Sequence, residues 1–142
     1  MADDVLINKA ATIERCVARA REEYAKDPVT FPIDFTRQDA AILNIQRACE
    51  AALDIGQHVI RREKLGVPQS ARDVFTLLAQ GGWIDAALDD KLKRMVGFRN
   101  IAVQNYQALQ LLILVSIIET HLDEFLEYSR ALLLGDASQT KE

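Results

Sequence analysis

Hydrophobic side chains recur every third or fourth position along most of the chain, which is the period of an α-helix. The first such stripe consists of Leu6, Ala10, Ile13, Val17, Ala20 and Tyr24. Its spacing predicts one helix with a single face turned toward a core. Pro28 and Pro32 follow the stripe. Because proline cannot continue a helix, we expect the first helix to end in the segment that contains them.

A second stripe predicts a longer helix in the middle of the chain. It consists of Ile42, Ile45, Cys49, Ala52, Gly56 and Val59. Thr36 and Asp39 have the spacing of a capping box, in which two side chains accept the free backbone N–H groups of a helix start. We expect Gly66 and Pro68 to end this helix, because both residue types favour a helix stop.

Three more helices are expected after it. Ser70 and Asp73 form a second capping-box pattern, which opens a short helix that should end at Gly81 and Gly82. The fourth helix starts around Leu88 and carries Leu92, Met95, Arg99 and Val103 on one side. The last helix ends before Gly135, and its stripe consists of Leu111, Leu114, Val115, Ile118, Leu122, Phe125 and Leu126.

The predicted fold is an all-α antiparallel bundle of four long helices and one short helix, because strand signals and internal repeats are absent. We expect one domain over residues 1–135 and a disordered tail over residues 136–142. The first half of the last helix is apolar on nearly every side, so it needs neighbours on more than one side. In a chain of 142 residues, a second copy is the natural neighbour, which predicts a homodimer.

Charge and composition narrow the possible functions. The formal net charge is -4, so nucleic acid could be bound only through a local patch of Lys and Arg. Cys16 and Cys49 both lie in helical stripes and are expected to be buried free thiols. The N-terminus is acidic and lacks the apolar segment of a signal peptide. The apolar run 109–118 is shorter than the roughly 20 residues of a membrane span. We therefore expect a soluble, cytoplasmic protein that does not enter a membrane.

Several common chemistries lack their motifs in this sequence. It contains no Gly-rich phosphate loop, no HExxH and no GxSxG. His58 and His121 are the only histidines, and neither has the spacing of a metal ligand. We expect both on the surface, and we expect no metal and no cofactor. The acidic residues within 119–127 and the basic run 61–64 are expected to be solvated charge.

A polar segment, GFRNIAVQNYQ (residues 97–107), precedes the longest apolar run. Arg99 occupies a stripe position where a core residue is expected, and burying a guanidinium without a partner is costly. Lys91, Lys93 and Arg94 lie within two turns of it and form a local positive patch of the kind that RNA binding needs. The other interpretation is a paired Arg–Asn cluster that closes the bundle, and the residues alone slightly favour it.

The spacing of the segment also limits how its side chains can meet. Tyr106 is seven positions after Arg99 and shares its face if the helix continues, whereas Gln104 lies about 140° around an ideal helix from Arg99. Arg99 and Gln104 therefore converge only if the helix breaks here or if a dimer brings two copies of the segment together. An anion site requires Arg99 to face a water-accessible groove.

The stretch MVGFRNIAVQNY (residues 95–106) resembles the signature of HEPN-domain ribonucleases, which is an arginine, a spacer of four to six residues that usually begins with a polar residue, and a histidine. It resembles more closely the HepT toxin family, whose form is Arg, four residues, His, one residue, Tyr. ILNIQRACEAALDIGQHVI and GVPQSARDVFTLLAQGGWI are similar to the second and third helices of that family. The resemblance spans almost the whole chain.

The resemblance implies a HEPN-type bundle and a homodimer in which two motifs meet at the interface. It implies a metal-independent endoribonuclease, the toxin of a bacterial toxin–antitoxin pair, acting on cellular tRNA or mRNA. In such a reaction a ribose 2′-hydroxyl attacks the adjacent phosphate, a histidine transfers protons, and an arginine stabilises the added negative charge. Arg99 matches the catalytic arginine, Asn100 the polar residue after it, and Tyr106 the tyrosine, but Gln104 stands where the histidine belongs.

Gln104 changes the expected activity. A glutamine amide does not exchange a proton near neutral pH, and loss of a general acid–base group typically costs a factor of about 10²–10⁴ in rate. We therefore expect a chain that folds, dimerises and binds RNA but cleaves it poorly or not at all. Either the histidine was replaced so that a toxin could be produced in cells, or it was lost in evolution. The intact Arg99, Asn100 and Tyr106 favour the first origin, because a decaying site would lose other residues as well.

The resemblance also implies a partner. In the HepT family an MntA-type nucleotidyltransferase antitoxin silences the toxin by transferring AMP to the motif tyrosine, here Tyr106. The added phosphate would place negative charge beside Arg99, where an RNA phosphate must lie. Two alternatives stay open: a non-catalytic helical module that binds a nucleotidyltransferase or a nucleotide, and a purely structural bundle in which Arg99 serves stability alone.

Overall fold

The computed structural model describes residues 3–104 and 111–140, and for residues 103, 104, 139 and 140 it describes the backbone alone. Every element in these ranges is helical. In chain order they are α1 (Asp4–Ala25), the 3-10 turn η1 (Phe31–Ile33), α2 (Phe35–Glu63), α3 (Ala71–Gln80), α4 (Ala86–Gln104), α5 (Leu111–Ser116), the π-helical turn η3 (Ile117–His121) and α6 (Asp123–Thr140). The predicted all-α fold is confirmed, and homodimer formation stays a prediction.

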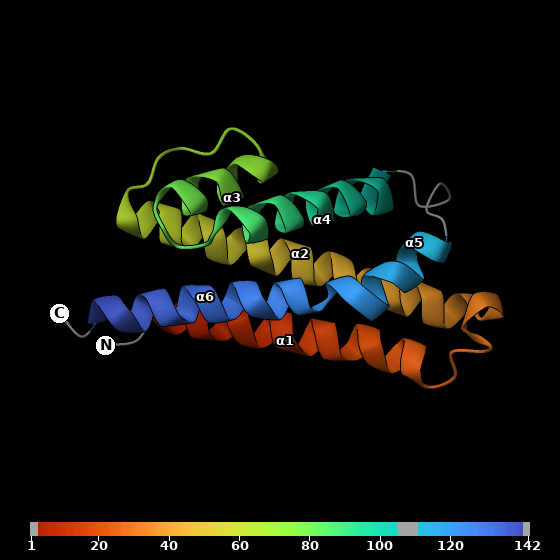
Figure 1. The fold of residues 1–142 in the computed structure, drawn as a ribbon. Coiled ribbons are helices and arrows are strands. Elements are labelled where there is room, and N and C mark those ends of the chain that lie inside the picture. The colour runs from red at the N-terminus through yellow and green to blue at the C-terminus, as the bar shows by residue number, and fades with distance from the viewer. Residues whose placement is uncertain (1–2, 105–110, 141–142) are drawn as a thin grey trace.

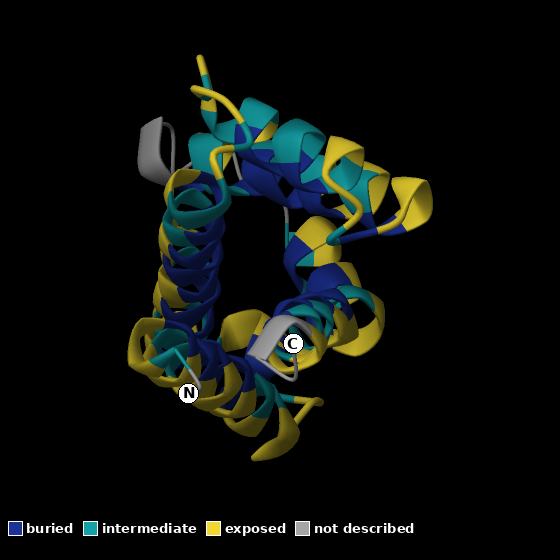
Figure 2. Ribbon diagram, turned by 90° about the vertical axis from the view of Figure 1, so that its left-hand side faces the viewer, coloured by how far each residue is buried: buried dark blue, intermediate teal, exposed yellow. Residues whose placement is uncertain are grey.

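The long helices run alternately up and down the bundle (Figure 1). α1 and α2 form an antiparallel hairpin, α6 packs along α1, and α4 contacts both α2 and α6. α3 packs against α2 and α4 at the end of the molecule that carries both chain termini. Viewed from that end, the helices turn buried residues inward and exposed residues outward (Figure 2). The end of α4 and the start of α5 lie at the opposite end of the bundle from the chain termini (Figure 1).

The centre of the core depends on a close approach between α2 and α6. Tyr128 on α6 is fully buried, and its hydroxyl donates a hydrogen bond of 2.7 Å to the carbonyl of Ala52 on α2. Burial raises the pKa of Tyr128 well above its usual value, so the phenol stays neutral. A Cβ at Gly56 would lie 2.6 Å from Val74 and 2.7 Å from the Tyr128 hydroxyl. Only glycine fits at this point of α2 without displacing these neighbours.

The helix starts are capped by side chains, although one of them differs from the prediction. Ser70 accepts the backbone N–H of Asp73 at 3.1 Å and caps α3, as its sequence pattern predicted. The predicted cap of α2 at Thr36 is wrong. The cap lies two residues earlier, at Asp34, whose side chain accepts the N–H of Arg37 at 3.1 Å. Asp is as good an N-cap as Thr or better, so the sequence held two competing start signals.

The end of α2 also differs from the prediction. We expected Gly66 to stop the helix, but α2 ends at Glu63 and Lys64 takes the left-handed conformation with φ 55°. The N–H of Leu65 then bonds the carbonyl of Ile60 at 3.0 Å, which closes the last turn. Gly66 has φ 136° and lies in the following loop. A lysine in this conformation bears a cost that glycine avoids, so the position of the stop could not be read from residue preference alone.

The sequence predicted one continuous last helix that ends at a glycine. The structure differs on both points. The π-helical turn η3 separates α5 from α6. Thr120 within η3 donates its hydroxyl to the carbonyl of Ser116 at 2.6 Å, a side-chain bond that competes with the helical ladder. α6 then continues through Gly135 to Thr140.

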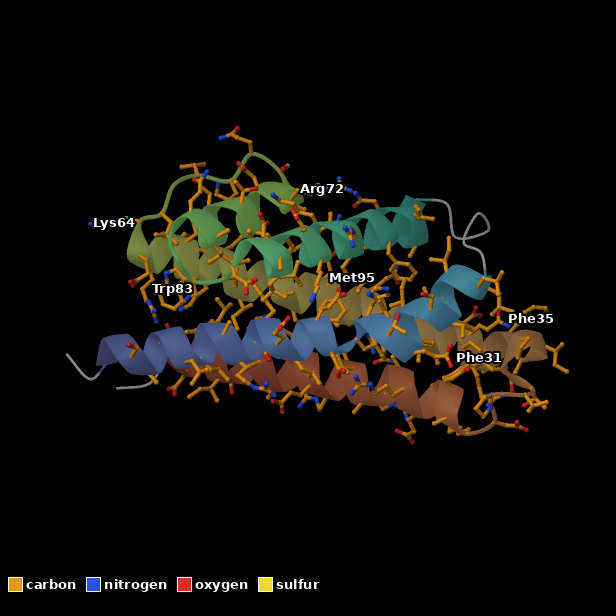
Figure 3. All side chains as sticks on the ribbon, in the orientation of Figure 1. Phe31, Phe35, Lys64, Arg72, Trp83 and Met95 are labelled. Carbon is orange, nitrogen blue, oxygen red and sulfur yellow. The ribbon has the colours of Figure 1, made fainter. Side chains whose placement is uncertain are left out.

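Gly135 is a packing position and not a stop. A Cβ there would lie 2.6 Å from the ring of Trp83, which lies between the α3–α4 side of the molecule and α6 (Figure 3). Asp136, expected at the start of a disordered tail, is buried in α6. It pairs with Arg62 on α2 at 2.7 Å.

That ion pair belongs to a terminal cluster formed by Asp3, His58, Arg62 and Asp136. Asp3 lies 2.6 Å from His58 and 2.9 Å from Arg62. Burial alone would raise the pKa of Asp3, but hydrogen bonds from His58, the Leu6 N–H and Arg62 outweigh it and lower the pKa to about 2. We expected His58 and the basic run 61–64 to be solvated surface. This prediction is wrong for His58 and Arg62, whose contacts join α1, α2 and α6.

Cys16 and Cys49 are buried free thiols, as predicted. Among the helices that the structure describes, none has the length and apolarity that a membrane crossing requires.

Candidate functional site around Arg99

Arg99 lies in the last turns of α4, and oxygen atoms hold its guanidinium at two points. Its Nε donates to Glu50 Oε1 on α2 at 2.7 Å, and its Nη1 donates to Asn100 Oδ1 at 2.7 Å. The Arg99 side chain is 24% exposed and that of Glu50 is 53% exposed. The guanidinium is therefore fixed in direction but still reaches water, which a site for an anion requires.

The packing of α4 explains why Arg99 lies at the edge of the core. Asp85 accepts the Leu88 N–H at 2.8 Å at the helix start. From there α4 buries one face in the bundle, which consists of Leu88, Leu92, Met95, Val96, Phe98 and Ala102. Arg99 belongs to the same face near the end of α4, where its side chain is 24% exposed and its guanidinium reaches Glu50 on α2.

Asn100 provides a positioning contact within the same helix turn. Its side-chain oxygen accepts from Arg99, and a neutral acceptor restricts the guanidinium without cancelling its charge. The sequence predicted Asn100 from the motif alone. It did not predict Glu50, which lies 49 positions away on another helix. An exposed glutamate in a helix carries no local signal of such a contact.

Cys49 lies next to Glu50 but offers no nucleophile. Burial raises the pKa of its thiol to about 12, an effect that the nearby Arg99 charge opposes only in part. The sulfur is 3.8 Å from the Met95 carbonyl oxygen, to which the S–H donates. Cys49 is therefore a neutral core residue beneath the site.

The structure separates the three predicted RNA-binding cations from Arg99. Lys93 pairs with Asp89 at 3.0 Å along α4. Lys91 and Arg94 line a groove of about 570 Å³ on another side of the helix, and Arg99 does not line it. Arg94 and Arg99 are five positions apart, which is about 140° around the helix. An RNA-binding role for Lys91, Lys93 and Arg94 stays a prediction.

The groove beside Lys91 and Arg94 is largely apolar. Its walls come from α4, α5, η3 and the start of α6, and the exposed fractions are 43% for Ile101, 81% for Leu112 and 44% for Ile113. Apolar side chains gathered on a surface in this way mark a contact surface more often than isolated ones do.

The remaining residues of the motif are only partly described. α4 includes the backbone of Gln104, while its side chain lies outside the described part of the structure. Tyr106 falls in the segment 105–110, which is also outside the described residues. The structure thus places Arg99, Asn100 and the backbone of Gln104 on one helix.

Within residues 3–104 and 111–140, no three His, Cys, Asp or Glu side chains lie close enough together to hold a metal ion.

With the bundle and this arginine site described, the chain can be compared with known proteins. Residues 13–132 match the family described as ribonuclease HepT-like, so the chain belongs to that family. The mRNA nuclease HepT of Shewanella oneidensis is 52% identical over 126 residues, which cover 89% of this chain and 94% of the relative. The resemblance seen in the sequence is confirmed.

Solved structures of similar proteins agree with this assignment. The toxin of a toxin–antitoxin complex with AMP-PNP has a TM-score of 0.88 and 49% identity, covering 92% of this chain and 98% of that one. A tri-AMPylated HEPN toxin of Shewanella oneidensis, in complex with its MNT antitoxin, has a TM-score of 0.87 and 50% identity, covering 92% and 97%. The bundle is therefore a HEPN toxin fold.

Proposed function

We propose that this chain is the toxin of a bacterial toxin–antitoxin pair and that it binds cellular RNA at Arg99. Membership of the HepT-like ribonuclease family and the relative described as an mRNA nuclease support the proposal. The single observation that carries it is the Arg99 guanidinium, held at the surface by Glu50 and Asn100 and open to water. Its ion-pair partner Glu50 is 53% exposed, so an incoming phosphate can displace that carboxylate.

The proposed reaction is cleavage of RNA by its own 2′-hydroxyl, without a metal. The hydroxyl attacks the adjacent phosphorus, the bond to the 5′-oxygen breaks, and one proton leaves the hydroxyl while another reaches the departing oxygen. Arg99 stabilises the negative charge on the phosphate oxygens. Gln104 takes the place of the proton-transferring histidine and can only donate and accept hydrogen bonds. The chain therefore binds RNA and cleaves it slowly or not at all.

We propose further that two copies of the chain form the site. The exposed apolar residues Ile101, Leu112 and Ile113 lie on α4 and α5, beside the motif-bearing end of α4, and a second copy would cover them. Arg99 does not line this groove, so the proposed two-fold axis passes near the end of α4, where it would bring the two Arg99–Gln104 segments together. It would also overcome the angle that separates these residues on a single helix.

The proposed regulator is a nucleotidyltransferase antitoxin acting in the cytoplasm. Similar toxins have been crystallised with an antitoxin, and one of them is tri-AMPylated. Tyr106 is the acceptor that we propose in this chain. AMP on Tyr106 would place phosphate charge near Arg99 and compete with the RNA backbone for it.

The deciding experiment is to restore the histidine with Gln104→His. We expect RNA cleavage to rise by a factor of about 10²–10⁴ over the unmodified chain, with growth inhibition when it is expressed without antitoxin. Gln104→Asn serves as the matched control, because it changes the side chain without adding a proton-transferring group. If Gln104→His neither cleaves RNA nor inhibits growth, the chain is a non-catalytic module and the nuclease proposal fails.

A further inference from the structure

A second groove, of about 850 Å³, lies between α1 and α2 on the side of α2 that carries Glu50. Its charged lining residues are Lys9, Arg15, Arg19, Arg47, Glu50 and Asp54. Cations outnumber carboxylates there by two, although the whole chain has a net charge of -4. The groove is thus a locally positive channel on an acidic protein, which is the arrangement that a polyanion requires.

Two of these cations are not neutralised by the groove itself. Lys9 pairs with Asp54 at 3.3 Å, and Arg19 pairs with Glu22 at 2.9 Å. In the described part of the chain, neither Arg15 nor Arg47 forms an ion pair, and both are exposed. The one hydrogen bond of Arg15 there is a long contact of 3.5 Å to Thr12.

Arg15 and Arg47 approach the groove from opposite walls, one on α1 and the other on α2. Both charges act on Cys16, which lies in the groove: burial raises the pKa of its thiol, and Arg47 and Arg15 oppose that rise. Two guanidinium groups from different helices therefore act on the same point of the groove. Each is suited to grip a phosphate through paired N–H groups.

The groove is continuous with the candidate site through one residue. Glu50 lines the groove and also accepts the 2.7 Å hydrogen bond from Arg99. Arg47 is three positions before Glu50 on α2, so the two side chains are neighbours on the same helix face. A chain of charged groups thus leads from Arg99 through Glu50 to Arg47 and across to Arg15.

We infer that the α1–α2 groove binds the single-stranded RNA next to the phosphate held by Arg99, with Arg15 and Arg47 contacting backbone phosphates. This inference rests on the proposed function and extends it to a surface that the sequence motif does not include. RNA is favoured over a protein partner because Arg15 and Arg47, which line the groove, are exposed and form no ion pair within the described residues. The apolar groove at Ile101 and Leu112 has the character of a protein contact instead.

The substitution at Gln104 makes the test direct, because RNA bound to this chain is not expected to be consumed. The probe is a fluorescein-labelled single-stranded RNA of mixed sequence, about 12 nucleotides long. Its affinity is measured by fluorescence anisotropy between about 50 and 200 mM salt. The variants are the double substitution Arg15→Ala with Arg47→Ala, the charge-preserving pair Arg15→Lys with Arg47→Lys, Arg99→Ala, and Arg61→Ala.

Arg61 is the matched control, since it is an exposed arginine of α2 that does not line the groove. We expect the double alanine variant to bind about tenfold more weakly. We also expect the slope of log affinity against log salt to fall by about 1.4, since each phosphate contact on a single strand contributes about 0.7. The lysine pair should retain most of that slope, and Arg61→Ala should change neither quantity. Thermal unfolding of each variant separates lost binding from lost folding.

Three other outcomes are informative. If Arg99→Ala weakens RNA binding while the double alanine variant binds normally, the groove inference is wrong and the proposed function stands. If the unmodified chain does not bind the RNA at all, the proposed function fails and the groove inference with it. If the double variant keeps RNA affinity but loses binding to the cognate antitoxin, the groove is a protein-docking surface and the inference is overturned.

Discussion

Two arginines in this bundle have nearly the same exposure but different surroundings. The side chain of Arg62 is 27% exposed and that of Arg99 is 24% exposed. Arg62 pairs with Asp3 at 2.9 Å and with Asp136 at 2.7 Å, and Asp136 is only 7% exposed. The ion-pair partner of Arg99 within the described residues is Glu50, which is 53% exposed.

The difference lies in how easily the bound carboxylate can be replaced. The Arg62 guanidinium also contacts Glu63 and lies 5.7 Å from the centre of the Trp83 ring, so it is held on several sides. Removing any partner would leave a charge poorly solvated. Glu50 instead faces water, where an exposed pair contributes little, so an incoming phosphate can take its place. Accessibility of the partner therefore distinguishes the two sites better than accessibility of the arginine.

The largest expected effect is on stability, at the terminal cluster. Arg62→Ala leaves the buried Asp136 without its cation and removes the ion pair that joins α2 to α6. We expect the free energy of unfolding to fall by about 2 kcal/mol, between the values for exposed and fully buried pairs. Urea denaturation measures it. Arg99→Ala in the same assay should change stability by less than about 0.5 kcal/mol, and an equal loss in both variants would contradict the distinction.

The next effect concerns RNA affinity, which we expect to depend on Arg99 and not on Arg62. Arg99→Ala should weaken binding of single-stranded RNA about tenfold, because a charge-assisted contact to phosphate is lost. Arg62→Ala should leave that affinity unchanged at temperatures where the variant is folded. Anisotropy titrations at one salt concentration test both. A loss of affinity in Arg62→Ala of similar size would mean that the terminal cluster also contacts RNA.

Part of the site could be predicted from the sequence and part of it could not. Arg99 and Asn100 stand in a local motif, so their place on one helix could be predicted. Glu50 could not be predicted, because the contact depends on how α2 and α4 pack across 49 positions. For the same reason His58 was expected on the surface although it contacts Asp3, since the chain start and α2 meet only in the folded bundle.

The fold shows the same division between local and distant information. The apolar stripes predicted every long helix, because the spacing of apolar residues along the sequence follows the helical period. Two helix ends predicted from glycines were wrong: Gly66 does not stop α2, and Gly135 lies inside α6. A glycine lowers the cost of a stop but does not impose one. At Gly135 the ring of Trp83 occupies the space of a side chain, which no local pattern reveals.

A smaller effect should follow from pH at the terminal cluster. The pKa of Asp3 is about 2 in the folded chain and near 3.8 when unfolded, so ionised Asp3 stabilises the fold fully above pH 3.8. That stability is lost as the pH falls from about 3.8 to about 2. Urea midpoints measured across this window should drop more for the unmodified chain than for Asp3→Asn. Parallel curves for the two proteins would show that Asp3 does not contribute.

The smallest expected effect is at the carboxylate beside Arg99. Glu50→Gln keeps a hydrogen-bond acceptor for the Arg99 Nε but removes the charge that competes with phosphate. We expect RNA affinity to rise about threefold, with a stability change below about 0.5 kcal/mol. Asp54→Asn, at another carboxylate of the same groove that does not contact Arg99, is the matched control. Weaker RNA binding by Glu50→Gln would indicate that the phosphate needs Glu50 to orient Arg99.

The π-helical turn η3 has a consequence for the two halves of the last helical segment. A π turn accommodates one residue more than an α turn, so it offsets the helix faces on either side by about 100°. After the turn, α6 directs Phe125, Tyr128 and Leu132 inward, whereas before it α5 leaves Leu112 and Ile113 outside. One added residue thus lets a single hydrophobic stripe leave apolar side chains at the surface before the turn and fill the interior after it.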